Sequence, residues 1–100
     1  MIIVTAMMDV KSGKKETFIN ETQSLISATR NEKGCISYNL YASTEDNNVL
    51  VMLEEWKDSD ALNNHMKTNH FKKFGKTIKH LLAKEIEINS YSVFHDGSLK

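Results

Sequence analysis

The run Val49–Trp56 is the feature that most limits how this chain can fold. Successive side chains of an extended strand point to opposite faces, so the even-numbered positions from Leu50 to Trp56 share one face. The odd-numbered positions from Val49 to Leu53 are apolar as well. A strand that is apolar on both faces is expected to be covered on both, so this run predicts a strand between two covering layers.

The remaining segments divide by period into strands and helices. Apolar residues recur at helical spacing after residue 14, whereas residues 35–42 alternate and are followed by the turn-forming residues 43–48. The expected elements are a strand over Ile2–Val10, a helix over Lys14–Asn31, a hairpin of strands over Cys35–Ala42 and Val49–Trp56, a helix from Asp58, and a last strand over Glu85–Phe94.

The second helical segment carries two apolar stripes that do not share a phase. Leu62 and Met66 lie on one face, whereas the stripe that begins with Phe71 and Phe74 follows another. Stripes out of phase predict a kink or a restart, which we place near Thr68-Asn69. The short oxygens of Asp58-Ser59-Asp60 suit the start of this segment as an N-cap.

The element order βαββαβ predicts an α+β fold of the ferredoxin-like type, an antiparallel sheet with both helices on one face. Residues 1–95 are expected to form one domain and residues 96–100 a tail. Because both helices cover the same face, the cover for the other apolar face is expected from a second copy of the chain. We therefore expect a symmetric homodimer that packs sheet against sheet.

Composition excludes several classes of function. The 13 basic and 13 acidic residues give no net charge, so we expect no nucleic-acid partner. Cys35 is the only cysteine, which excludes an internal disulfide and reads as a buried strand residue in a reducing compartment. The first residues lack a basic leader and reach Asp9 too early for a signal peptide or a membrane span, so a cytoplasmic protein is expected.

The corner between the third strand and the second helical segment gathers the candidate site residues. Glu54 and Trp56 share a largely apolar face, where a buried carboxylate needs a donor. His65 on the following helix is within plausible reach of Glu54, either as part of a site or as a structural hydrogen bond that anchors helix to sheet. His70 lies close in sequence; a lone histidine here reads as a satisfied half-buried ring, and two near one irregular helix shift the balance towards a site.

No metal and no stored cofactor are expected from the sequence. His65 and His70 are five residues apart, about 140° around an ideal helix, so they do not converge on one ion unless the helix breaks between them. Lys11-Ser12-Gly13-Lys14 lacks the leading glycine of a P-loop, and no glycine-rich dinucleotide fingerprint occurs.

Together these residues resemble a known family, the antibiotic biosynthesis monooxygenase domain, in its small quinol-monooxygenase-like branch. The resemblance covers nearly the whole chain. Three motifs carry it: Gly34-Cys35-Ile36-Ser37-Tyr38 at the second strand, Leu53-Glu54-Glu55-Trp56-Lys57-Asp58 at the corner, and Leu62-Asn63-Asn64-His65 with Asn69-His70-Phe71 on the helix.

The resemblance implies a dimeric ferredoxin-like barrel with a pocket between sheet and helices. It further implies oxidation of an electron-rich phenol or quinol by dioxygen, without flavin, haem or metal. The roles that it implies are His65 as base, Glu54 as its orienting partner, Trp56, Phe71 and Phe74 as pocket walls, and Tyr38 and His70 as secondary polar contacts.

Other activities remain open on the same fold. A related branch degrades haem, but its strand asparagine is replaced here by Thr5 and Ala6, its helix tryptophan by His65, and its later histidine falls near Gly75, so this activity is disfavoured. A pocket with a base and an acid could instead isomerise a small carbonyl metabolite by proton transfer. A dimer that binds an aromatic ligand without catalysis is the third alternative.

Overall fold

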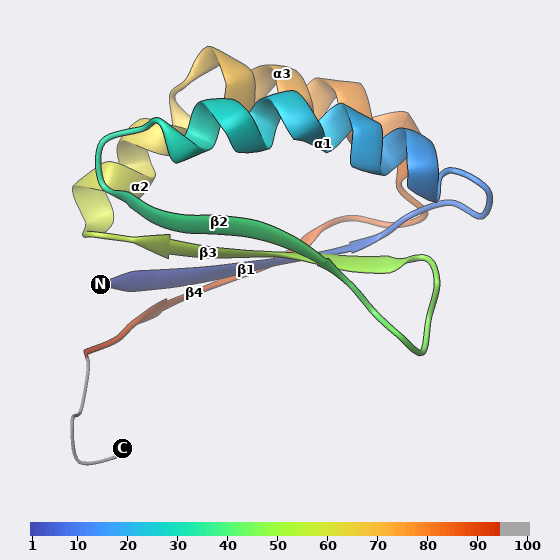
Figure 1. Ribbon diagram of the computed structural model, residues 1–100, viewed down its shortest axis with the longest axis horizontal. Coiled ribbons are helices and arrows are strands. Elements are labelled where there is room, and N and C mark those ends of the chain that lie inside the picture. Colours follow the sequence, from blue (N-terminus) through green and yellow to red (C-terminus); the bar gives the residue numbers. More distant parts are fainter. Residues whose placement is uncertain (95–100) are drawn as a thin grey trace.

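A computed structural model, which describes residues 1–94, shows a four-stranded antiparallel sheet with helices on one face (Figure 1). The strand order is β2-β3-β1-β4, the ferredoxin-like order. The elements are β1 (Ile2–Asp9), α1 (Lys15–Arg30), β2 (Cys35–Ala42), β3 (Val49–Trp56), α2 (Ser59–Met66), α3 (Asn69–Ile78), the short 3₁₀ helix η1 (Lys79–Leu81) and β4 (Glu87–Ser92).

The predicted elements agree closely with the observed ones. The bounds of β2 and β3 are those expected, and the second helical segment breaks between Met66 and Asn69 as its two stripes predict. Each part of that segment begins with its own cap, because the Asp58 carboxylate accepts from the Ala61 N–H and the Thr68 hydroxyl accepts from the next helix. The expected tail at residues 96–100 and the last residue of the expected domain, His95, lie outside the described residues.

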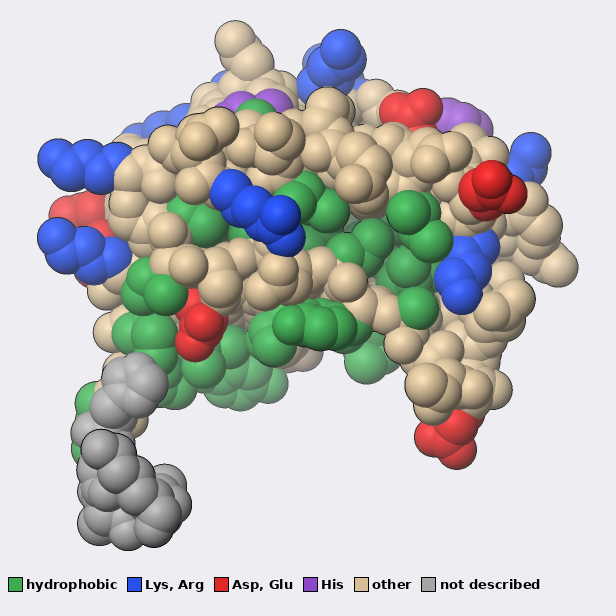
Figure 2. Space-filling model, in the orientation of Figure 1, with side chains coloured by type: hydrophobic (Ala, Val, Ile, Leu, Met, Phe, Trp, Pro, Cys, Tyr) green, Lys and Arg blue, Asp and Glu red, His purple; other side chains and the backbone are tan. Residues whose placement is uncertain are grey.

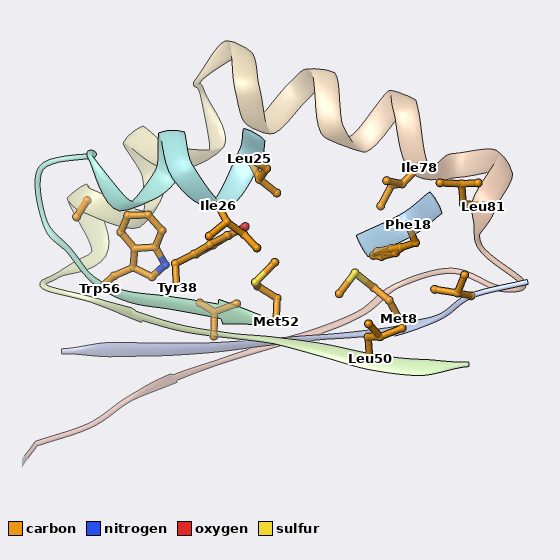
Figure 3. Close-up of a cluster of buried hydrophobic side chains, with 13 residues drawn as sticks. Met8, Phe18, Leu25, Ile26, Tyr38, Leu50, Met52, Trp56, Ile78 and Leu81 are labelled. Atoms are coloured by element: carbon orange, nitrogen blue, oxygen red, sulfur yellow. The ribbon is translucent and has the colours of Figure 1, made fainter. Parts of the chain in front are cut away.

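The hydrophobic core lies between the helices and the upper face of the sheet (Figure 3). Alternation along β3 is strict, with Leu50, Met52 and Trp56 buried under the helices. Phe18 from α1 and Ile78 from α3 close over them, so the strands contribute one wall and the helices the other. This arrangement places the even-numbered face of β3 beneath the helices of both halves of the chain.

The opposite face of the sheet has no covering layer among the described residues. Leu53, Met7 and Tyr91 are 37%, 48% and 53% exposed, and the strand register puts all three on this side. Figure 2 shows hydrophobic side chains gathered along the lower side of the molecule, beneath the sheet. We call this surface the open face.

The helices within residues 1–94 are all too short or too polar to cross a bilayer. The strand expected over Ile2–Val10 is observed as β1, one residue shorter at its end.

Candidate active site

The strand β3 presents a buried carboxylate next to a buried indole. Trp56 Nε1 donates a 2.9 Å hydrogen bond to Glu54 Oε1, and both side chains face the helices. Burial raises the pKa of Glu54 to about 7, although the bond from Trp56 opposes the shift, and the charge of Glu32 adds to it. Glu54 can therefore hold or release a proton near neutral pH.

The turn between α1 and β2 brings a second carboxylate to this region. Gly34 has φ of +90°, and a Cβ at this position would lie 2.5 Å from the Ala61 side chain of α2. Its carbonyl accepts from the Lys57 N–H at 2.8 Å, which ties the turn to the strand-to-helix corner. Only glycine allows this approach, and it brings Glu32 beside α2.

The break between α2 and α3 is held by one side chain. Thr68 Oγ1 donates to the His65 carbonyl at 2.7 Å and accepts from the Phe71 N–H at 3.2 Å. The end of α2 and the first turn of α3 are thereby fixed relative to each other. His65 at the end of one helix and His70 at the start of the next now face the same point.

That point is occupied by the Glu32 carboxylate. Its Oε2 lies 2.8 Å from His65 Nδ1 and 2.6 Å from His70 Nε2. An ionised carboxylate only accepts hydrogen bonds, so the proton of neutral His65 resides on Nδ1, and Nε2 keeps a free lone pair. The side chains of His65, Glu32 and His70 are 2%, 13% and 28% exposed, so the cluster runs from the interior towards solvent.

Aromatic rings enclose His65. Its centroid lies 4.6 Å from Trp56, 5.0 Å from Phe71 and 5.6 Å from Tyr38. Its Nε2 is buried and has no hydrogen-bond partner among the described residues. Burial lowers the pKa of His65 and outweighs the opposing effect of Glu32, which keeps the ring neutral and able to accept a proton.

His65 also lines a cavity of about 250 Å³ between the sheet and the helices. Its walls are mostly apolar, and Tyr38, Glu54 and Ser90 supply the other polar side chains. Burial, reinforced by the charge of Glu54, raises the pKa of Tyr38, so its hydroxyl stays protonated and can donate. The apolar lining comes from Val4, Ala6, Met8, Met52, Leu62, Met66, Phe71, Phe74, Ile78, Ile86 and Ile88.

The structure brings most of the predicted site residues to this cavity. Tyr38, Glu54, His65, Phe71 and Phe74 all line it. Two residues are placed differently from the prediction. Trp56 packs behind His65 and is fully buried, and His70 borders a separate hollow between α1 and α3, so neither lines the cavity.

The partner expected for His65 is also corrected. Glu54 bonds Trp56, and Glu32 takes the place next to the imidazole. The sequence contained one signal for Glu32: an acid just after a helix C-terminus is repelled by the helix dipole and needs a compensating partner. The two histidines are that partner.

An α+β sandwich open on one face, with a buried histidine beside an apolar cavity, defines a small ferredoxin-like domain with a candidate ligand pocket between sheet and helices. A statistical description of the family "Antibiotic biosynthesis monooxygenase" matches residues 1–77. The chain belongs to the antibiotic biosynthesis monooxygenase family.

Individual relatives agree with this assignment. The protein "Putative monooxygenase YcnE" of Bacillus subtilis is 39% identical over 88 residues, which cover 88% of this chain and 93% of the relative. A crystal structure of a conserved protein from Methanosarcina mazei is 43% identical, with a TM-score of 0.87 over 90% of this chain and 89% of that one. A Nitrosomonas europaea structure at 21% identity and TM-score 0.90, covering 95% and 100% of the chains, shares the fold.

Proposed function

We propose that the chain oxidises an electron-rich phenol or quinol with dioxygen in the cavity beside His65, without a cofactor. The observation that carries this proposal is the free Nε2 of a buried, neutral imidazole on a lining residue. A quinol anion passes an electron to dioxygen far more readily than the neutral quinol does. A protein that removes the proton and excludes water therefore supplies the main part of the catalysis.

The reaction balances with the groups present. His65 Nε2 takes a hydroxyl proton from the quinol, and the Glu32 carboxylate at Nδ1 stabilises the imidazolium that forms. One electron passes from the anion to dioxygen, and the resulting pair of radicals combines to form a carbon–oxygen bond. The peroxide anion formed in this way takes the proton back from His65, and the resulting hydroperoxide loses water, so that quinol plus dioxygen gives a hydroxyquinone and water.

The other lining groups have roles that their protonation states allow. Tyr38 as a neutral phenol donates to a substrate oxygen, and Phe71 and Phe74 contact the ring. Trp56 does not line the cavity and would act indirectly, since it donates to the Glu54 carboxyl and packs against His65 with the two rings tilted. We assign these residues as positioning groups for a small aromatic substrate.

The proposal includes a homodimer formed through the open face. The odd-numbered side chains of β3 and β1 present an apolar surface that one copy of the chain leaves exposed. A second copy packed sheet against sheet would bury it symmetrically. We further propose a cytoplasmic setting, which suits the free thiol of Cys35.

An oxygen electrode tests the proposed reaction. Protein is mixed with a panel of reduced quinones, and dioxygen uptake is followed for the wild type, His65→Ala and the control His80→Ala. His80 is exposed on η1, outside the cavity lining, so its loss should leave the rate unchanged. We expect His65→Ala to lower the rate by roughly 100-fold or more, as loss of a general base does. An unchanged rate would remove His65 from the proposed role.

Proton-transfer isomerisation is the second candidate, because the cavity also holds Glu54, an acid whose pKa is raised to about 7. A base and an acid in one cavity suffice to move a proton within a small carbonyl compound. Assays with and without dioxygen distinguish the two functions. An isomerase forms product without dioxygen, whereas the oxidation stops completely under argon, and a simple binder shows ligand-induced stabilisation with neither turnover.

A further inference from the structure

The cluster of Glu32, His65 and His70 has a property that the proposed oxidation does not use. Each residue offers one ligand atom, and these atoms lie within 4.8 Å of one another. We propose that the three side chains form a binding site for a divalent transition-metal ion of the Zn²⁺ class at His65 Nδ1, with two ligands, Glu32 and His70, that do not line the cavity.

The two imidazole nitrogens already converge on a single point. His65 Nδ1 and His70 Nε2 both make hydrogen bonds to Glu32 Oε2, at 2.8 and 2.6 Å, so their lone-pair or N–H directions meet there. Zinc–nitrogen bonds are about 2.0–2.1 Å, so an ion at this point needs the rings to close in by roughly 0.7 Å and the carboxylate to swing back. Glu32 lies in the turn between α1 and β2, outside the regular elements, so its side chain can move without disturbing a helix or strand.

The helix break is what makes this convergence possible. On one continuous helix, residues five apart point about 140° away from each other. Thr68 interrupts the helix, bonds the carbonyl of His65 and caps α3, so His70 returns towards His65. The five-residue spacing of His65 and His70, which argues against a shared ion on a continuous helix, is compatible with one in this broken helix.

The donor set and its surroundings fit such an ion. Two imidazoles and one carboxylate are a recurrent three-ligand set for Zn²⁺, with water as the fourth ligand. Metal ligation requires an ionised carboxylate and deprotonated imidazole nitrogens, so the three ligands would bring a charge of −1 to the cation. The His70 side chain is 28% exposed and borders a hollow of about 320 Å³ between α1 and α3, so solvent reaches this member of the cluster.

Metal binding has a consequence for the cavity that rests on the proposed function. An ion on Nδ1 places the single proton of neutral His65 on Nε2, so the ring then donates rather than accepts. The cavity loses its base while the ion is bound. Zn²⁺ is therefore expected to inhibit the oxidation, and its removal by a chelator to restore it.

Calorimetry tests the site without any assay of activity. Chelator-treated full-length protein is titrated with Zn²⁺, and Co²⁺ is added in parallel to detect the absorption of a tetrahedral site. We expect one ion per chain. His70→Ala and Glu32→Gln should each weaken binding by more than about 100-fold, because even partners outside the ligand set contribute 10–100-fold. Circular dichroism checks that each variant is folded.

Two controls decide between this site and a surface ion. His80→Ala removes an exposed histidine that is not in the cluster and should leave the affinity unchanged. NMR of imidazole nitrogens should show the proton of His65 moving from Nδ1 to Nε2 on addition of Zn²⁺. Absence of binding at millimolar Zn²⁺, or binding that survives both cluster substitutions, would overturn the proposal.

The outcomes also separate this inference from the proposed function. Zinc binding by the cluster in a protein that oxidises no quinol retains the metal site and removes the oxidase. Oxidation that continues unchanged at saturating Zn²⁺, with no heat of binding, retains the oxidase and removes the metal site.

Discussion

The two faces of β3 have nearly the same apolar composition but differ strongly in how far they are buried. Leu50, Met52 and Trp56 on one face are almost completely buried, whereas Leu53 on the other is 37% exposed. The adjacent acids differ in the same way, since Glu54 is buried against Trp56 and Glu55 receives a bond from Ser37 on the open face. Hydrophobicity alone therefore does not decide what a strand position does; the layer that covers it does.

Truncating one side chain on each face of β3 should give the largest difference in the loss of unfolding free energy. Trp56→Ala removes a fully buried indole and leaves Glu54 without its donor, so we expect a loss of about 3–5 kcal/mol in unfolding free energy. Leu53→Ala at low protein concentration should cost less than about 1 kcal/mol. Urea unfolding measures both. Similar losses for the two variants would mean that the open face is covered in the single chain.

The pH dependence of stability should differ between the adjacent acids. The folded state raises the pKa of Glu54 from 4.5 to about 7, so it holds a proton that the unfolded chain releases. Stability must therefore fall as pH rises from about 4.5 to 7, by about 3 kcal/mol from this group. Glu54→Gln should remove this part of the slope. Glu55→Gln is the matched control for losing a carboxylate from the same strand.

Two glycines with positive φ differ in what surrounds them, and substituting each by alanine separates backbone strain from a clash with a helix. A Cβ on Gly34 would meet Ala61 at 2.5 Å, whereas a Cβ on Gly13 would meet nothing within 4 Å. Gly13→Ala should cost about 1 kcal/mol from backbone strain alone. Gly34→Ala should cost about 1–3 kcal/mol more, because α2 must shift. Thermal unfolding compares the two, and equal losses would show that the turn does not support α2.

A charge on the open face should have the smallest effect on folding and act on assembly. Leu53→Lys places an ammonium where the proposed dimer would exclude water, so we expect the dimer to weaken by about tenfold or more. Light scattering over a range of concentrations gives the mass. Lys73→Glu, on the exposed side of α3, controls for a change of charge. A wild-type chain that remains a monomer at micromolar concentration would contradict the proposed interface.

Periodicity predicted most of the fold because it reports on local geometry. The bounds of β2 and β3 and the break before Asn69 are explained by alternation and by two helical stripes out of phase. Glu32 was missed because its partners are 33 and 38 residues away and depend on how close the turn at Gly34 approaches α2. Local patterns carry no record of such an approach.

The same limit explains the misplaced side chains. Strand alternation put Trp56 on the same face as Leu50 and Met52, but it could not say that His65 would pack against the indole while Trp56 itself would not line the cavity. The position of His70 depends on the angle between α2 and α3, which the Thr68 bond to His65 helps to fix. The sequence indicates that the helix is irregular there but not what this angle is.

The number of residues in the two-residue link between α2 and α3 sets the direction in which α3 presents His70. Each residue added to a helix turns the rest of the helix by about 100°, so inserting or deleting one residue beside Thr68 would swing His70 to another side of the molecule. We expect substitutions in this link to change the direction of His70 little, whereas a change in the number of residues would rotate it by about 100°. Transplanting the paired imidazoles into another scaffold therefore requires copying the count of residues between them before copying their neighbours.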